Sequence, residues 1–266
     1  MSESRLYLRE EGSGAPLLLV HGWSCHGGFF TPQIEAFSRR YHVLVPDLPG
    51  HGRTGDGLPL TIEAAADAVA DLLEERDLSG VTICGWSMGA HVAYAYAQCH
   101  GTERLRSIAA IDMSPKVLNT PDWGLGSRGG LDAARNIHVL AAMVREWPQL
   151  APRIAQRIFA SDLVPDPDLF AYAIEEIRQA DPKLLKPMWA SLTSQDFRSL
   201  LTGLDVPLHM AFGAQSQLYG SEVVDWHKSH VPNVNIRVFE KSGHAPQLEE
   251  QDAFNDWLAR ILTGST

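Results

Sequence analysis

Cysteine is scarce in this chain, and the few cysteines form no pattern. Only three occur in 266 residues, and their spacing is wide and irregular, so a disulfide framework is not expected. Cys84 ends an apolar run and is predicted to be a small buried side chain, and Cys25 is predicted to be a packing residue rather than a site residue. This use of cysteine is typical of a protein in the reducing cytoplasm.

Positive charge is also scarce. The chain has 22 Lys and Arg residues against 32 Asp and Glu residues, which gives a formal net charge of −10 at pH 7. Nonspecific binding to nucleic acid needs a cationic surface that displaces phosphate counterions, and docking on anionic lipids needs the same sign of charge. Nucleic-acid and membrane partners are therefore not expected, and a small molecule is the expected partner.

Long apolar runs are missing as well. The first five residues are mostly polar and include an acid, and no stretch long enough to cross a bilayer follows them. We therefore predict neither a signal peptide nor a membrane span, and we expect a cytoplasmic protein. The oligomeric state stays open between a monomer and a homodimer.

No metal-binding pattern is present in the sequence. His227 and His230 are three residues apart, but no third ligand lies near them, and the H-E-x-x-H motif does not occur. We therefore predict a protein that works without a metal or another cofactor.

What the chain does contain is an alternation of strand-like and helix-like segments, which predicts an α/β fold with a mostly parallel sheet and helices on both faces. The alternation stops between residues 116 and 195, where only helix-like segments occur, and this gap is too long for an ordinary loop. We predict a core of residues 1–115 and 196–266 with an inserted helical cap of residues 116–195. The strand-like runs are residues 16–20, 42–45, 81–83, 107–111, 206–212 and 234–239.

The most informative motif is Gly-Trp-Ser-Met-Gly at residues 85–89. It follows a strand-like run and precedes a helix-like one, which is the context of a nucleophile elbow. At such a turn the serine takes a strained backbone conformation that exposes its hydroxyl, and the two glycines avoid clashes with the strand and the helix. Ser87 is therefore the predicted nucleophile, and the alternative is an inert serine in a tight turn.

A serine hydroxyl needs a base to take its proton and an acid to orient that base. His244 is the predicted base, because it lies in the loop after the last predicted strand, at the sheet edge where ligands of open α/β sheets bind. Ten other histidines compete with it. His21 precedes a glycine at the end of a strand and is predicted to be structural.

Together these motifs resemble the α/β-hydrolase family over nearly the whole chain. The matching pieces are the elbow, His-Gly-Trp at residues 21–23, Asp-Leu-Pro-Gly-His-Gly-Arg-Thr at 47–54, and Gly-His-Ala-Pro at 243–246. Within the family, the chain looks like the small carboxylesterases, including the methyl esterases that act on a pimeloyl carrier-protein conjugate. The resemblance implies the α/β-hydrolase fold, hydrolase activity, and an oxyanion hole formed by the backbone N–H groups of Trp23 and Met88.

The acid of the predicted triad departs from the family pattern. The family usually has it about three residues past a glycine, after the strand that corresponds to residues 206–212, but residues 213–220 contain no carboxylate. Asp112 is the predicted replacement, because it ends the strand beside the elbow strand, and some relatives have an acid there. Its alternative role is to hydrogen-bond the backbone of the turn that leads into the helical insertion. Glu222 and Asp225 are weaker candidates, since we expect them on the outer face of a helix.

The substrate pocket is expected between the elbow and the cap. Phe29, Phe30, Trp147 and Trp189 are candidates for its walls. The alternative is that these aromatic side chains only pack inside the protein.

The sequence therefore predicts a serine hydrolase that cleaves a carboxylic ester, thioester or lactone of a small to medium hydrophobic substrate. Two alternatives stay open. A cofactor-independent dioxygenase acting on a heteroaromatic compound such as a 3-hydroxy-4-quinolone would use the same histidine and acid. A non-catalytic ligand-binding module would have the same fold without turnover.

Overall fold

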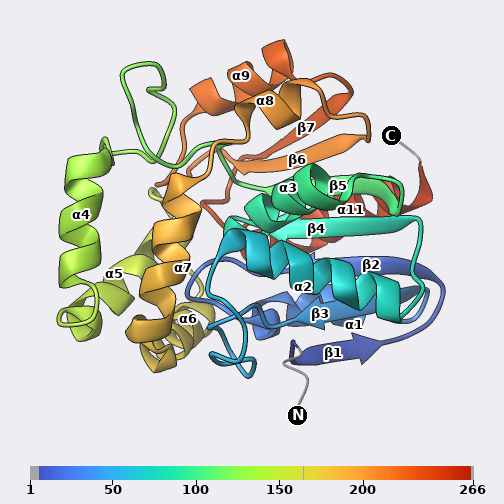
Figure 1. The fold of residues 1–266 in the computed structure, drawn as a ribbon, viewed down its shortest axis with the longest axis horizontal. Coiled ribbons are helices and arrows are strands. Elements are labelled where there is room, and N and C mark those ends of the chain that lie inside the picture. Colours follow the sequence, from blue (N-terminus) through green and yellow to red (C-terminus); the bar gives the residue numbers. More distant parts are fainter. Residues whose placement is uncertain (1–5, 164, 265–266) are drawn as a thin grey trace.

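A seven-stranded sheet forms the centre of the molecule in the computed structural model, which describes residues 6–163 and 165–264 (Figure 1). The strand order is β1-β3-β2-β4-β5-β6-β7, in which β1 is antiparallel to β3 and all other neighbouring strands are parallel. The strands are β1 (Leu8–Glu11), β2 (Ala15–Val20), β3 (Tyr41–Pro46), β4 (Val81–Trp86), β5 (Leu105–Ile111), β6 (Leu208–Gly213) and β7 (Val234–Phe239).

The middle strands are largely apolar because both faces of the sheet are covered. All residues of β4 and β6 are buried. On β2, Leu18 and Val20 pack toward the face covered by α2 and α3, whereas Leu17 and Leu19 pack toward the face covered by α1 and α11. The six strands expected from the sequence are confirmed with small shifts of their ends. The edge strand β1 was not expected, because it has only four residues, and these are mostly half-buried.

The helices outside residues 116–195 cover the two faces of the sheet (Figure 1). They form where amphipathic segments can bury one apolar side against it. They are the short 3₁₀ helix η1 (Gly27–Phe30), α1 (Thr31–Phe37), α2 (Ile62–Glu75), α3 (Met88–His100), α8 (Arg198–Thr202), α9 (Ser221–His230), α10 (Pro246–Glu249) and α11 (Gln251–Thr263).

Between β5 and β6 the described part of the chain contains no strand, and the only pairing there is an isolated bridge between Thr120 and Trp123. Four helices lie together at one end of the sheet, on the left of Figure 1: α4 (Ala133–Ala142), α5 (Trp147–Ile158), α6 (Pro167–Gln179) and α7 (Pro182–Ser194). The helical character expected of residues 116–195 is therefore confirmed, while their role as a separate cap stays a prediction.

Among the described residues, no helix is both long and apolar enough to span a membrane. The polar residues 1–5, on which the expectation of no signal peptide partly depends, lie outside the described part of the chain.

Candidate active site

Ser87 lies at a sharp turn between β4, which ends at Trp86, and α3, which begins at Met88. Its backbone has φ 54° and ψ −116°, a conformation that side-chain-bearing residues rarely adopt and that stores strain. The flanking glycines are required by space, since a Cβ at Gly89 would overlap the carbonyl oxygen of Val20 and one at Gly85 would overlap that of Gly89. The predicted strand–turn–helix geometry of the elbow is therefore present.

Asp112 lies beside Ser87 because the strands that precede them are neighbours in register. Trp86 of β4 pairs with Ile111 of β5, so the residues after each strand end at the same edge of the sheet. The Ser87 amide donates to the Ile111 carbonyl at 2.9 Å, and the Asp112 amide donates to the carbonyl of Ala211 on β6 at 2.8 Å. Asp112 is fully buried and also has a positive φ, of 44°.

His244 meets Asp112 from the loop after β7. Its Nδ1 lies 2.6 Å from Asp112 Oδ2, and both side chains are buried. The His244 backbone is held from two sides, since its amide donates to the Ile158 carbonyl at 2.8 Å and its carbonyl accepts from Trp86 Nε1 at 2.7 Å. This arrangement fixes the plane of the imidazole and leaves Nε2 as the ring nitrogen available on the side away from Asp112.

The loop without a carboxylate supports Asp112 instead of replacing it. The Ser216 hydroxyl donates to Asp112 Oδ2 at 2.7 Å, and the Gly213 amide donates to Asp112 Oδ1 at 3.2 Å. Ser216 is itself buried and three residues past Gly213. Sequence reasoning missed this residue, although its place is the one where the family usually has its acid.

Glu249 is a second residue that the sequence analysis missed. One carboxylate oxygen accepts from the amide of Gly243, next to His244, at 2.7 Å, and the other accepts from the amide of Ala160, after α5, at 2.8 Å. Burial raises the pKa of Glu249 to about 7, and the backbone donors oppose this shift only in part. Glu249 thus ties the His244 loop to the end of a helix between β5 and β6.

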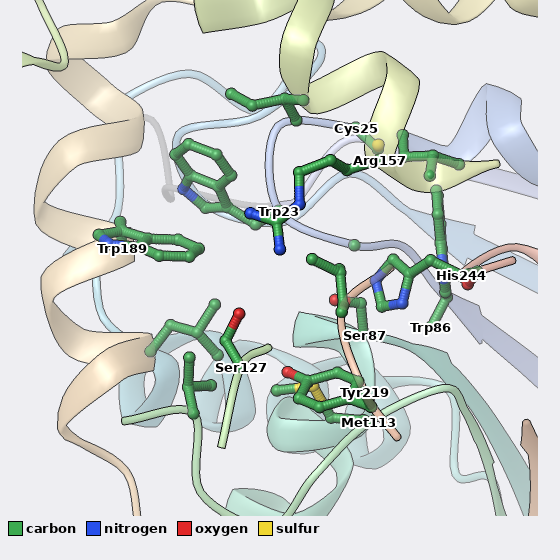
Figure 2. A pocket seen from close by; sticks show the side chains of 16 residues that line it. Trp23, Cys25, Trp86, Ser87, Met113, Ser127, Arg157, Trp189, Tyr219 and His244 are labelled. Carbon is green, nitrogen blue, oxygen red and sulfur yellow. Dashed lines mark hydrogen bonds between the residues drawn. The ribbon is translucent and has the colours of Figure 1, made fainter. Parts of the chain in front are cut away.

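Ser87 and His244 line one cavity of about 120 Å³, and Figure 2 shows their side chains next to each other at its wall. The other walls are mainly apolar and come from the sheet edge, α5, α7 and the loop after β6. The lining residues used below are Trp23, Ser127, Arg157, Trp189 and Tyr219.

Only one of the four aromatic residues expected in the pocket wall lines this cavity, namely Trp189. The expectation was wrong for Phe29, Phe30 and Trp147. Phe29 and Phe30 are fully buried in the core beneath the sheet edge, and Trp147 packs behind Trp23 with an edge-to-face ring distance of 6.0 Å. Their apolar character is explained by packing inside the protein.

Trp23 connects the sheet edge to the helices between β5 and β6. Its ring lies 4.7 Å from that of Trp189, and its Nε1 donates to the Leu185 carbonyl at 3.0 Å. Its backbone follows directly after Gly22, where an added Cβ would lie 3.4 Å from Ser87 Cβ. Met88 is the first residue of α3, where backbone amides have no partner inside the helix. The two residues expected to supply the oxyanion donors therefore both lie close to Ser87, one in space and one along the chain.

Five other histidines are buried, His209 among them, and burial lowers the pKa of each. His21 accepts from the Leu48 amide at 2.9 Å, which confirms its structural role, and its pKa is about 3. The pKa is about 3 for His51 and about 4 for His91 and His227. Within residues 6–163 and 165–264, no group of three His, Cys, Asp or Glu side chains is placed to hold a metal ion.

The remaining candidates lie as expected, except for Cys25. Cys84 is fully buried. Cys25, expected to be a packing residue rather than a site residue, is buried but also lines the cavity, and burial raises the pKa of its thiol. Glu222 and Asp225 are exposed on α9, whereas Asp112 is buried beside His244.

Comparisons with known proteins show which proteins this chain is similar to. The chain is 25% identical to a pimeloyl-[acyl-carrier protein] methyl ester esterase from Nitrosomonas europaea, over 94% of this chain and 96% of that protein. It is 26% identical to the protein of the same name from Chromobacterium violaceum, over 97% and 98%. An esterase structure from Exiguobacterium antarcticum superposes with a TM-score of 0.88 at 20% identity, covering 97% of this chain and 95% of that one.

A family model also matches most of the chain. The model of the alpha/beta hydrolase family matches residues 17–257, which include six of the seven strands of the sheet in whole or in part, the elbow and the loop of His244. The chain therefore belongs to the alpha/beta hydrolase family and is an enzyme of the hydrolase class.

Proposed function

We propose that this hydrolase cleaves short carboxylic esters with Ser87 as nucleophile, His244 as base and Asp112 as the acid that orients His244. The observation that carries the proposal is the 2.6 Å contact between His244 Nδ1 and Asp112 Oδ2, at the sheet edge where Ser87 has its strained conformation. The serine faces a cavity, the histidine lies on the same wall, and the buried carboxylate lies behind the histidine. This is the arrangement in which a base and an acid activate a serine nucleophile.

In the first half of the reaction, Ser87 Oγ attacks the ester carbonyl carbon and His244 Nε2 takes the hydroxyl proton. The imidazolium that forms is stabilised by the carboxylate of Asp112, which does not itself become protonated. The tetrahedral intermediate then collapses, the C–O bond to the alcohol breaks, and His244 returns the proton to the leaving oxygen. The products of this half are the free alcohol and an acyl group on Ser87.

In the second half, a water molecule takes the place of the alcohol. His244 Nε2 removes a proton from the water as its oxygen attacks the acyl carbon. Collapse of the second intermediate breaks the bond to Ser87 Oγ, which regains its proton from His244. The carboxylic acid leaves, and the enzyme returns to its starting protonation state.

Both intermediates carry a negative oxygen, and the backbone amides of Trp23 and Met88 are the proposed donors to it. Met88 follows the nucleophile at the start of α3, where the partial positive charge of the helix end adds to the effect. Because these donors belong to the main chain, their side chains do not decide the chemistry. The placement of Trp23 at the cavity wall and of Met88 next to Ser87 supports the assignment.

The cavity supports a small substrate, and the helices between β5 and β6 support a cap over it. A volume of about 120 Å³ is close to that of an engineered protein cavity of about 150 Å³ that binds benzene. Ile154 from α5 and Trp189 from α7 line it, which is the position expected of a cap of residues 116–195. The relatives are named as methyl ester esterases, which favours an ester over a thioester or a lactone.

Neither of the alternative functions gains a specific observation. The dioxygenase hypothesis depended on an acid at Asp112, which an esterase uses equally well. The relatives from Nitrosomonas europaea and Chromobacterium violaceum are esterases by name, and the strain at Ser87 has no purpose in a binding module.

The test replaces Ser87 with Ala and measures hydrolysis of p-nitrophenyl butyrate. We expect turnover to be lost, and we expect a fluorophosphonate probe to label the wild-type enzyme at Ser87 but not the variant. Ser199→Ala, on the exposed surface of α8, is the matched control and should behave as wild type. Wild-type turnover in Ser87→Ala would remove the proposal. Oxygen uptake with a 3-hydroxy-4-quinolone, without ester hydrolysis, would replace it by the dioxygenase hypothesis.

A further inference from the structure

One charged side chain in the cavity has no role in the chemistry above. Arg157 lies in the last turn of α5, and its guanidinium points into the cavity between the indole of Trp23 and the side chains of Ser87 and His244 (Figure 2). Among the described residues that line the cavity, it is the only one with a permanent charge. Arg157 is partly exposed to solvent, yet it also reaches a cavity whose other walls are mainly apolar.

Arg157 has no counterion within the protein. In residues 6–163 and 165–264 no carboxylate forms an ion pair with it, and the one hydrogen bond of its side chain runs to the Gln217 carbonyl at 3.1 Å. A guanidinium has five N–H donors, so most of them remain available to the cavity or to solvent. Partial burial lowers the pKa of Arg157 from its usual value, which is the direction expected when a charge loses water without gaining an anion.

Neutral donors lie on the opposite wall of the same cavity. The Tyr219 hydroxyl and the Ser127 hydroxyl both point toward its centre in Figure 2. Burial raises the pKa of Tyr219, so the phenol keeps its proton at neutral pH and can donate. Its hydroxyl donates to the sulfur of Met113 at 3.2 Å, a weak acceptor that a carboxylate oxygen would outcompete.

We propose that Arg157 binds a carboxylate group of the substrate, so that the preferred esters are short esters with one free carboxylate. The proposal rests on the function assigned to Ser87 above and names the substrate class of that same site. A planar guanidinium matches a carboxylate with two parallel hydrogen bonds, which gives both affinity and orientation. The small cavity keeps the carboxylate within a few bonds of the ester carbonyl.

A purely structural role for Arg157 is the competing explanation. Its bond to Gln217 ties α5 to the loop that carries Ser216, and that loop supports Asp112. The loop, however, has a second tie, because Arg128 donates to the Ser216 carbonyl at 2.8 Å. A role as a tie also leaves unexplained why the remaining donors of Arg157 face the cavity.

The test compares esters that differ only in charge. Monomethyl glutarate carries its carboxylate on the acyl side, and methyl 5-methylhexanoate is its neutral counterpart of the same shape. Carboxymethyl butyrate carries the carboxylate on the alcohol side, and isobutyl butyrate is its neutral counterpart. Hydrolysis is followed by acid release at constant pH for the wild type, Arg157→Gln and Arg157→Lys. Arg153→Gln, one turn earlier on α5 and exposed, is the control for the loss of one positive charge.

We expect the wild type to prefer the charged ester of at least one pair, and the pair identifies the side of the ester that carries the carboxylate. In Arg157→Gln the ratio of kcat/KM for the charged ester to that for its neutral counterpart should fall about tenfold or more. In Arg157→Lys this ratio should fall less, and in Arg153→Gln it should stay at the wild-type value.

The inference is overturned if the wild type prefers the neutral ester in both pairs. It is also overturned if Arg157→Gln lowers kcat/KM equally for both esters of each pair, as loss of the hydrogen bond to the Gln217 carbonyl would. Fluorophosphonate labelling of Ser87 in every variant separates these failures from failure of the proposed function. A labelled Ser87 with an unchanged ratio rejects only the carboxylate subsite, whereas an unlabelled wild type rejects the nucleophile itself.

Discussion

The hydroxyl of Ser216 donates to Asp112 Oδ2 at 2.7 Å, and the same oxygen lies 2.6 Å from His244 Nδ1. The carboxylate is therefore held between a hydroxyl from the loop after β6 and the imidazole from the loop after β7. The place where the family usually has its acid thus still serves the histidine, but through one more residue. Asp112 and the residue that supports it, Ser216, can therefore be tested separately.

Asp112→Asn should lower kcat for p-nitrophenyl butyrate by about 10³- to 10⁴-fold, the scale of the same substitution in a serine triad. The amide cannot balance the positive charge on His244, and it can favour the wrong tautomer of the imidazole. Steady-state kinetics measure the loss, and circular dichroism checks that the fold is kept. Unchanged turnover would show that Asp112 is not the acid, without affecting the assignment of Ser87.

Ser216→Ala should lower kcat by about three- to thirtyfold and leave KM unchanged, because Ser216 touches Asp112 and not the substrate. The range corresponds to part or all of a hydrogen bond to a charged group. The rate of labelling by a fluorophosphonate should fall by the same factor, since this rate reports the activation of Ser87. A change in KM alone would mean that Ser216 shapes the pocket rather than holding the acid. Ser199→Ala serves again as the control.

The fold and the meeting of Ser87, Asp112 and His244 at one sheet edge could be predicted because their signals are local. Ser87 is marked by the glycines beside it, and Asp112 and His244 each follow a strand-like run, so the common edge of a parallel sheet brings them together. The register of Trp86 with Ile111 then places the first two side by side.

The other site residues could not be predicted because their contacts link distant parts of the chain. Ser216 is 104 residues from Asp112, and Glu249 is 89 residues from Ala160, so no periodicity or spacing records either contact. Arg157 looks like any basic residue in the last turn of an amphipathic helix. Hydrophobicity alone also does not tell a pocket wall from a core, and for this reason Phe29 was placed wrongly.

Glu249 should make the folded state less stable at alkaline than at acidic pH. Its pKa is about 7 in the folded state against an ordinary 4.5, so the folded state binds more protons between these values. The free energy of unfolding therefore falls as the pH rises from about 4.5 to 7. The fall is about 3 kcal/mol, because each tenfold change in proton affinity is worth about 1.4 kcal/mol. Above pH 7 the loss is complete.

The measurement compares urea unfolding of the wild type and Glu249→Gln at pH 5 and pH 8. The amide introduced by this substitution does not titrate, so the variant should lack this part of the pH dependence, although it loses one acceptor at all pH values. Contributions of the buried histidines are the same in both proteins and cancel. Glu222→Gln, exposed on α9, should keep the wild-type difference. An equal difference in wild type and Glu249→Gln would mean that Glu249 is already ionised at pH 5.

Moving the acid back to the loop should partly rescue the enzyme that lacks Asp112. In Asp112→Asn combined with Ser216→Asp, the new carboxylate starts from a Cβ whose hydroxyl already reaches the oxygen bonded to His244. We expect kcat to rise at least about tenfold above that of Asp112→Asn alone, because the negative charge next to the imidazolium is restored. Asp112→Asn combined with Ser216→Asn has nearly the same shape without the charge and should show no rescue. Equal activity of the two double variants would mean that the loop directs residue 216 at Asp112 but not at His244, and that the acid cannot be moved between the two strands by one substitution.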